Sequence, residues 1–148
     1  MSLKICLVSS ASPGKGKIIP NGIRILAGIA HEEDKSSDIR VYDGNFHSDI
    51  ELEEKVKLFK PDILGVSIFT DNSEKSIRLL NSIESPIKIA GGPFAAQLPN
   101  ELLTHCDYVF LGEAELSFPI FLNSIKFNGF DKGKMPSIAG VRSKSEKE

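Results

Sequence analysis

Hydrophobic residues gather in six short clusters along the chain, and every cluster but the last is followed by a stretch with helical periodicity. The clusters cover residues 4–8, 38–42, 62–68, 87–90, 107–111 and 137–141. Several are nearly continuous apolar runs, which is typical of strands covered on both faces. Their alternation with helices predicts an α/β fold. We expect a doubly wound, mostly parallel sheet in a flavodoxin-like or Rossmann-like three-layer sandwich, with strand order 2-1-3-4-5 and 137–141 as a sixth strand at an edge.

The segments between the clusters carry the apolar stripes of amphipathic helices. The first helix is expected to open at Pro20, because the fixed φ and missing N–H of proline are tolerated there. The second is expected to end before Pro61. Asp71 and Glu74 have the spacing of a capping box at the start of the third. Two more helices are expected near residues 100–105 and over 115–127.

Length and composition limit the kind of protein. The 148 residues fit one domain, expected over 1–142, with a charged tail or linker at 143–148. A formal charge of −2 provides no basic surface for nucleic acid. No apolar run approaches the roughly 20 residues that span a bilayer, and no signal peptide precedes the first strand, so a cytoplasmic protein is expected. Cys6 and Cys106 are too far apart for a C-x-x-C motif.

The turns after the predicted strands carry the candidate chemistry, because ligands of parallel sheets bind beyond the carboxyl ends of the strands. Gly91 and Gly92 would let a ligand approach the backbone closely, or would form only a tight turn, and Gly92 is expected to be the position most sensitive to size. Glu113 could contact a ligand or stabilise a helix N-terminus, and Thr70 could donate to a ligand or cap a helix. The candidate binding residues are Ser9, Ser10, Ser67, Thr70, Gly91, Gly92, Pro93, Gly112 and Glu113.

The sequence lacks the specific motifs of nucleotide-binding proteins. Gly14 and Gly16 begin a G-x-G, but Ile19 stands where a dinucleotide fingerprint requires glycine. Lys17 is followed by Ile18 instead of Ser or Thr, so the Walker A pattern also fails. A phosphate-accepting receiver domain would need acidic residues after the first strand, where this chain has serines.

The histidines give no metal site. His31, His47 and His105 lack the spacing of metal ligands on a helix or hairpin. Only His47, in the loop after the second strand, lies where a ligand of the sheet could meet it. The sequence therefore assigns no metal ligand and no catalytic residue.

Taken in order, several segments resemble the cobalamin-binding domain at the N-terminus of cobalamin-dependent radical SAM proteins. They are I-I-P-N-G-I-R-I-L-A (18–27), I-R-V-Y-D (39–43), K-P-D-I-L-G-V-S (60–67), I-A-G-G-P (89–93), D-Y-V-F-L-G-E-A-E (107–115) and M-P-S-I-A-G-V (135–141). The resemblance implies that a corrinoid, cobalamin, lies across the carboxyl edge of the sheet with its nucleotide tail directed toward the strands. It also implies that the candidate binding residues line that site.

Two motifs of related proteins are absent from the sequence. No D-x-H-x-x-G follows the first strand, so the resemblance implies a corrinoid without a histidine lower ligand. The C-x-x-x-C-x-x-C of a radical SAM barrel is also lacking. S-adenosylmethionine and a 4Fe-4S cluster are therefore expected only in a radical SAM catalytic domain, supplied in cis or in trans. A fragment of such an oxidoreductase or methyltransferase is preferred over a stand-alone carrier, and this chain alone is not expected to be catalytic.

Two other functions stay open. The chain could be a flavin- or nucleotide-binding protein of the same fold class, because a fold does not fix a function. Ser9, Ser10 and Ser12 supply the hydroxyl groups of a flavodoxin phosphate loop but not its spacing. The chain could also be a docking domain that binds no cofactor.

Overall fold

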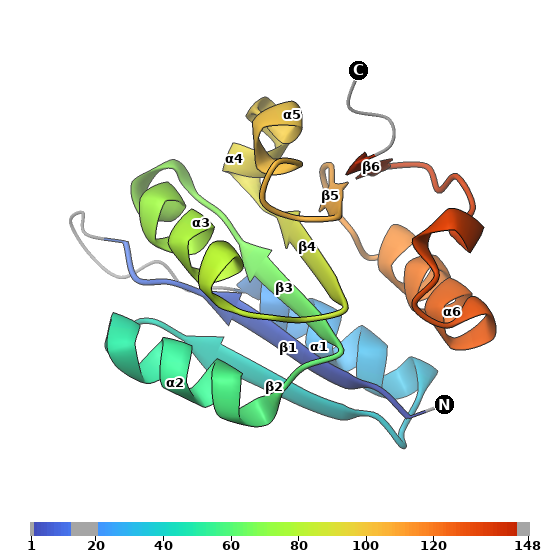
Figure 1. The fold of residues 1–148 in the computed structure, drawn as a ribbon, viewed down its shortest axis with the longest axis horizontal. Helices are drawn as coiled ribbons and strands as arrows, with labels where there is room; N and C mark the ends of the chain where they lie inside the picture. The colour runs from blue at the N-terminus through green and yellow to red at the C-terminus, as the bar shows by residue number, and fades with distance from the viewer. Residues whose placement is uncertain (1, 13–20, 145–148) are drawn as a thin grey trace.

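The computed structural model describes residues 2–12 and 21–144, which form one six-stranded sheet between two layers of helices (Figure 1). The strands are β1 (Lys4–Ser9), β2 (Asp38–Asp43), β3 (Ile63–Ser67), β4 (Ile87–Gly91), β5 (Tyr108–Phe110) and β6 (Val141–Ser143). Their order is β2-β1-β3-β4-β5-β6, and β1 to β5 run parallel. This confirms the predicted fold class and strand order.

The sixth strand lies at the predicted edge but begins later than expected. β6 pairs antiparallel with β5, with Phe110 opposite Val141. Residues 137–140 instead form a turn, in which the Val141 N–H donates to the Ile138 carbonyl at 3.0 Å. Gly140 has a φ of 82°, a left-handed conformation that glycine adopts without strain. The apolar Ile138 that marked the expected strand is buried in the core beside the sheet.

The helices follow the predicted alternation with shifted boundaries. They are α1 (Asn21–Glu33), α2 (Asp49–Phe59), η1 (Thr70–Asn72), α3 (Ser73–Ser82), α4 (Pro93–Gln97), α5 (Pro99–Leu102), α6 (Ser117–Asn128) and η2 (Lys132–Lys134). The helix expected near 100–105 is replaced by two short ones, each with a proline in its first turn. Pro119 lies in the first turn of α6, where its missing N–H is tolerated. Pro20 lies outside the described residues.

The capping box predicted at Asp71 and Glu74 is wrong. Residues 70–72 form the 3-10 turn η1, so α3 begins only at Ser73. The side chain that organises this turn is Asn72, whose Oδ1 accepts from the Phe69 N–H at 2.8 Å. A capping box does occur at α2, where Ser48 and Glu51 bond to each other's backbone N–H groups.

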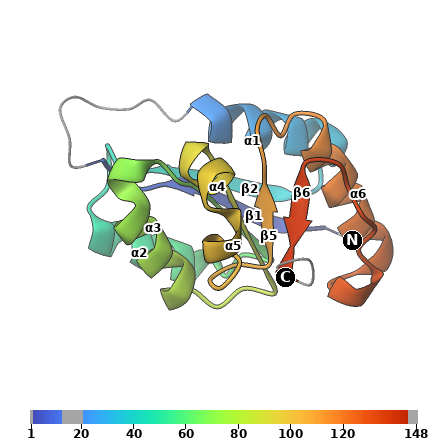
Figure 2. The same cartoon turned by 90° about the horizontal axis from the view of Figure 1, so that it is seen from above.

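Side chains alternate along the strands and build one core on each face of the sheet. Ile5 and Leu7 point to the face covered by α1 and α6, whereas Cys6 and Val8 point to the face covered by α2, α3, α4 and α5 (Figure 2). This two-sided burial explains why the strands are continuous apolar runs. Burial also raises the pKa of the Cys6 thiol to about 12, so the thiol stays protonated at neutral pH.

The described residues contain neither a candidate membrane-spanning helix nor a candidate metal cluster. None of the helices in this part of the chain combines the length and apolar character that crossing a bilayer requires. Within the same residues, no group of three or more His, Cys, Asp or Glu side chains is placed to hold a metal ion.

Candidate ligand-binding site

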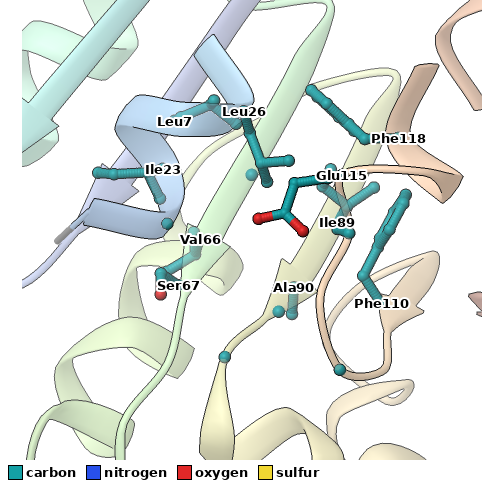
Figure 3. Close-up of a pocket in the computed structure, with 16 residues that line it drawn as sticks. Leu7, Ile23, Leu26, Val66, Ser67, Ile89, Ala90, Phe110, Glu115 and Phe118 are labelled. Carbon is teal, nitrogen blue, oxygen red and sulfur yellow. The ribbon is translucent and has the colours of Figure 1, made fainter. Parts of the chain in front are cut away.

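A cavity of about 160 Å³ opens at the carboxyl edge of the sheet, on the face covered by α1 and α6 (Figure 3). Its floor is formed by β3 and β4, and its walls by the first turns of α1 and the segment from β5 into α6. The lining residues are Leu7, Gly22, Ile23, Leu26, Gly65, Val66, Ser67, Ile89, Ala90, Gly91, Gly92, Phe110, Gly112, Ala114, Glu115 and Phe118. Helices that follow parallel strands begin at this edge, so the connections after β3, β4 and β5 converge on it.

The lining is mostly apolar. Among the described lining residues, Ser67 and Glu115 are the two with a polar side chain, and none carries a positive charge. Leu26, Ile89 and Phe110 present hydrocarbon surface from three different elements (Figure 3). Such a cavity favours an apolar group held by a few polar contacts.

The two glycines after β4 have different roles. Gly92 has a φ of 98°, and a Cβ there would lie 2.7 Å from the Ile68 carbonyl oxygen and 2.9 Å from the Ile68 nitrogen. Gly91 has no left-handed conformation, and a Cβ there would meet nothing closer than the Phe110 Cβ at 3.8 Å. The turn itself therefore requires glycine at position 92. This agrees with the second of the two roles considered from the sequence, that of forming a tight turn. Gly91 leaves open space on the cavity side.

Four of the predicted site residues meet at this cavity. Ser67, Gly91, Gly92 and Gly112 come from three different strand ends and all line it. Gly91–Gly92 and Gly112–Glu113 therefore lie at the same edge of the sheet, as predicted from parallel strands.

The other five predicted residues do not line the cavity. Thr70 and Pro93 are exposed and begin η1 and α4, and Glu113 is exposed beside the cavity. Ser9 and Ser10 are buried at the end of β1, with 5% and 6% of their surface exposed. Whether any of these residues binds a ligand stays a prediction.

A buried amide ties the first loop to the turn after β3. Asn72 is 1% exposed, and its Nδ2 donates to the Ser10 carbonyl at 2.9 Å. Its Oδ1 accepts from the Phe69 N–H and from the Ser76 hydroxyl, the latter at 3.3 Å. Two of these three hydrogen bonds are buried and the one from Phe69 is partly buried, so the network holds the turn in a defined geometry.

The sequence interpretation missed several lining residues, and Glu115 is the most important. Glu115 belongs to the same G-E-A-E segment as Glu113, the glutamate that the sequence predicts at the site. Gly22 and Leu26 lie in the predicted first helix and Phe110 in the predicted strand 107–111, and neither assignment marks a position at the cavity. The only sequence signal for them was their nearness to a strand end or a helix start.

The histidines lie in different parts of the fold. His31 is in the last turn of α1 and His105 precedes β5, so both lie toward the amino edge of the sheet. His47 follows β2 at the carboxyl edge, with its Nδ1 3.8 Å from a Glu51 carboxylate oxygen. None of the three lines the cavity as it is formed by the described residues.

A family model described as the B12 binding domain matches residues 11–122. The chain belongs to the B12 binding domain family. This match covers most of the helix–strand units of the domain, from the loop after β1 to the middle of α6. It favours the cobalamin interpretation of the sequence over a flavodoxin-like phosphate loop. No match was found among curated proteins.

Two solved structures that share this fold are radical S-adenosylmethionine enzymes with a corrinoid bound. The radical S-adenosylmethionine methyltransferase TsrM from Kitasatospora setae, with cobalamin and a 4Fe-4S cluster bound, is 18% identical with a TM-score of 0.74. The cobalamin-dependent S-adenosylmethionine radical enzyme OxsB, with aqua-cobalamin and S-adenosylmethionine bound, is 13% identical with a TM-score of 0.70. The matches cover 97% and 96% of this chain but only 29% and 22% of those chains. At these identities the likeness is one of fold.

Proposed function

We propose that this chain is the cobalamin-binding module of a radical SAM enzyme, and that it presents a corrinoid to a catalytic domain outside the chain. The observation that carries the proposal is the apolar cavity at the carboxyl edge of a sheet that belongs to the B12 binding domain family. The likeness to TsrM and OxsB supports a radical SAM partner domain, in cis or in trans, that would hold S-adenosylmethionine and the 4Fe-4S cluster.

The residues of the cavity fit the nucleotide tail of a corrinoid. Leu26, Ile89 and Phe110 can enclose a planar base, and the absence of a Cβ at Gly91 leaves space next to the β4 backbone. Ser67 can exchange hydrogen bonds with the polar part of the tail. A bound corrinoid would supply a cobalt centre able to carry a methyl group. The residues of this chain bind and orient the cofactor and keep water from its base.

The second part of the proposal is that no histidine of this chain is the lower cobalt ligand. His31 and His105 lie toward the opposite edge of the sheet, and the His47 imidazole is near Glu51 and packs edge-on against Tyr42. Electron paramagnetic resonance of the bound cobalt(II) form tests this. A nitrogen splitting that disappears in His31→Ala, His47→Ala or His105→Ala would contradict the proposal.

The test of binding is an absorbance spectrum after gel filtration of the protein incubated with hydroxocobalamin, with FMN, or with neither. We expect the corrinoid bands to elute with the protein in about one equivalent, and FMN to be removed. Retention of FMN without corrinoid would favour the flavin alternative. Retention of neither would favour a docking domain that binds no cofactor.

A further inference from the structure

One acidic side chain points into the apolar cavity. The Glu115 carboxylate lies near Leu26 and Ile89, with its oxygens directed toward the centre of the cavity (Figure 3). It comes from the segment between β5 and α6, just before the first residue of the helix. Glu113, two residues earlier, is not part of the lining. A carboxylate in such surroundings is unfavourable unless it faces water or a hydrogen-bond donor.

Among the described residues, this carboxylate has no partner. Nothing in the described part of the chain forms a hydrogen bond or an ion pair with Glu115. Acidic residues at other turns do have partners: Asp43 faces Arg24 at 3.6 Å, and Asp107 accepts from Lys132 at 2.7 Å. Glu115 is also not part of a metal site, since no group of potential metal ligands occurs among the described residues. Its two oxygens are thus open to a ligand in the cavity.

We propose that Glu115 determines which corrinoid the cavity selects, by accepting a hydrogen bond from the lower base of the nucleotide tail. This inference rests on the proposed function and names the ligand class of the same site. An ionised carboxylate is only an acceptor. A 5,6-dimethylbenzimidazole base, as in cobalamin, carries no N–H or O–H group when neutral. An aminopurine base carries an exocyclic amine, which can donate to Glu115.

The apolar walls give little discrimination between these bases, because both are planar and of similar size. The hydrogen bond to a charged acceptor supplies the difference, since such bonds are stronger than neutral ones. A ligand that fills the cavity takes the exposed Glu115 carboxylate out of water, so a base that donates to it is favoured over a base that leaves it unpaired. The chain is therefore expected to bind cobalamin and to bind a corrinoid with an adenine lower base more tightly.

The experiment compares three corrinoids on the intact chain: cobinamide, which has no lower base, cobalamin, and adeninylcobamide. Dissociation constants are measured by titration for the unmodified protein, for Glu115→Leu and Glu115→Gln, and for the matched control Glu113→Leu. We expect the unmodified protein to prefer adeninylcobamide over cobalamin by about tenfold or more, equal to about 1.4 kcal/mol. Glu115→Leu should abolish this preference by weakening adeninylcobamide, whereas Glu113→Leu should keep it.

The outcomes separate the two proposals. Equal affinity for the two complete corrinoids, or a preference that persists in Glu115→Leu, would overturn the role of Glu115 and leave the proposed function intact. Failure of all three corrinoids, cobinamide included, would overturn the proposed function and the selectivity with it. Glu115 is exposed at the protein surface, so both variants should fold, and melting temperatures verify this. Glu115→Gln keeps an acceptor oxygen without the charge and should retain part of the preference.

Discussion

The two faces of the sheet are built from the same strands but differ at the carboxyl edge. The face under α1 and α6 opens into a cavity of about 160 Å³, whereas the hollow between α2 and α3 on the other face measures about 40 Å³. The strands contribute small residues to the first face, above all Gly65 and Gly91. On the second face Ile68 and Ala95 are both fully buried in the core.

The difference also concerns how the turns are held. On the second face the turn after β3 is fixed by Asn72, which bonds to backbone groups of Ser10 and Phe69. On the first face α1 and α6 are linked near their carboxyl ends, where Lys126 faces Asp34 at 3.2 Å and Asn123 donates to Glu33 at 3.2 Å. The starts of the same two helices border the cavity. The face covered by α2 to α5 thus holds the strand ends in place. The face covered by α1 and α6 leaves room for a ligand beside them.

The largest expected effect is at Gly92, where the turn after β4 contacts the loop after β3. Gly92→Val should lower the free energy of unfolding by about 3 kcal/mol or more, because it adds left-handed strain to a collision with the Ile68 backbone. The melting temperature should fall by roughly 10 °C. Gly112→Ala is the control: its φ is 69° but no atom lies within 4 Å of its Cβ position, so only the strain applies. Equal losses in the two variants would show that the contact with Ile68 is unimportant.

The next effect tests the polar network of the second face. Asn72→Ala should cost about 2–3 kcal/mol, because it leaves the Phe69 N–H and the Ser10 carbonyl without their buried partner. Ser76→Ala removes only the hydroxyl at 3.3 Å and should cost about 1 kcal/mol or less. Urea unfolding of both variants measures the difference. A tolerated Asn72→Ala would mean that the turn after β3 is held by packing alone.

A smaller effect is expected at Gly91, this time on binding. Gly91→Val places methyl groups on the cavity side of β4 without a backbone collision and should weaken hydroxocobalamin binding about tenfold, or ~1.4 kcal/mol. Stability should change by less than about 1 kcal/mol, since valine is favourable in strands. Ser82→Val, in the small hollow of the other face, is the control and should leave affinity unchanged. Equal binding by all three proteins would place the ligand elsewhere.

The smallest effect concerns the link between α1 and α6 in acid. Hydrogen bonds from Ser36, its hydroxyl first, hold the pKa of Asp34 well below its usual range. A lowered pKa contributes stability that is present above the unfolded-state value, near 3.8, and is lost as the pH falls through the folded-state value. Asp34→Asn should therefore lose less stability than the unmodified protein between pH 7 and pH 3, measured by urea unfolding.

Asp71→Asn, at an exposed position on the other face, is the matched control for this pH dependence. It should follow the unmodified protein over the whole range. If Asp34→Asn also followed it, the hydrogen bonds from Ser36 and the ion pair with Lys126 would together contribute nothing measurable to the pH dependence.

The sequence was sufficient for features that depend on local pattern. Alternation of apolar runs and helix stripes gave the sheet order and the edge that carries Gly91 and Gly112, because parallel strands align their carboxyl ends. The sequence pattern was not sufficient where two neighbouring polar residues could each organise the same turn. Asn72 organises the turn before α3 in place of Asp71, since a buried amide both donates and accepts whereas a carboxylate only accepts.

The sequence by itself determined that this chain is an α/β domain with glycine-rich turns at one sheet edge, and its ordered motifs pointed to the cobalamin-binding family. Only the tertiary structure decided which face carries the cavity and which glutamate enters it. Glu113 and Glu115 differ by two positions in one loop, and their directions depend on the left-handed Gly112 and on the start of α6 at Ser117. Such directions are set by the packing of α6 against α1 and the sheet. Residues far apart in the chain decide that packing, so the directions of these two side chains cannot be predicted from the local sequence.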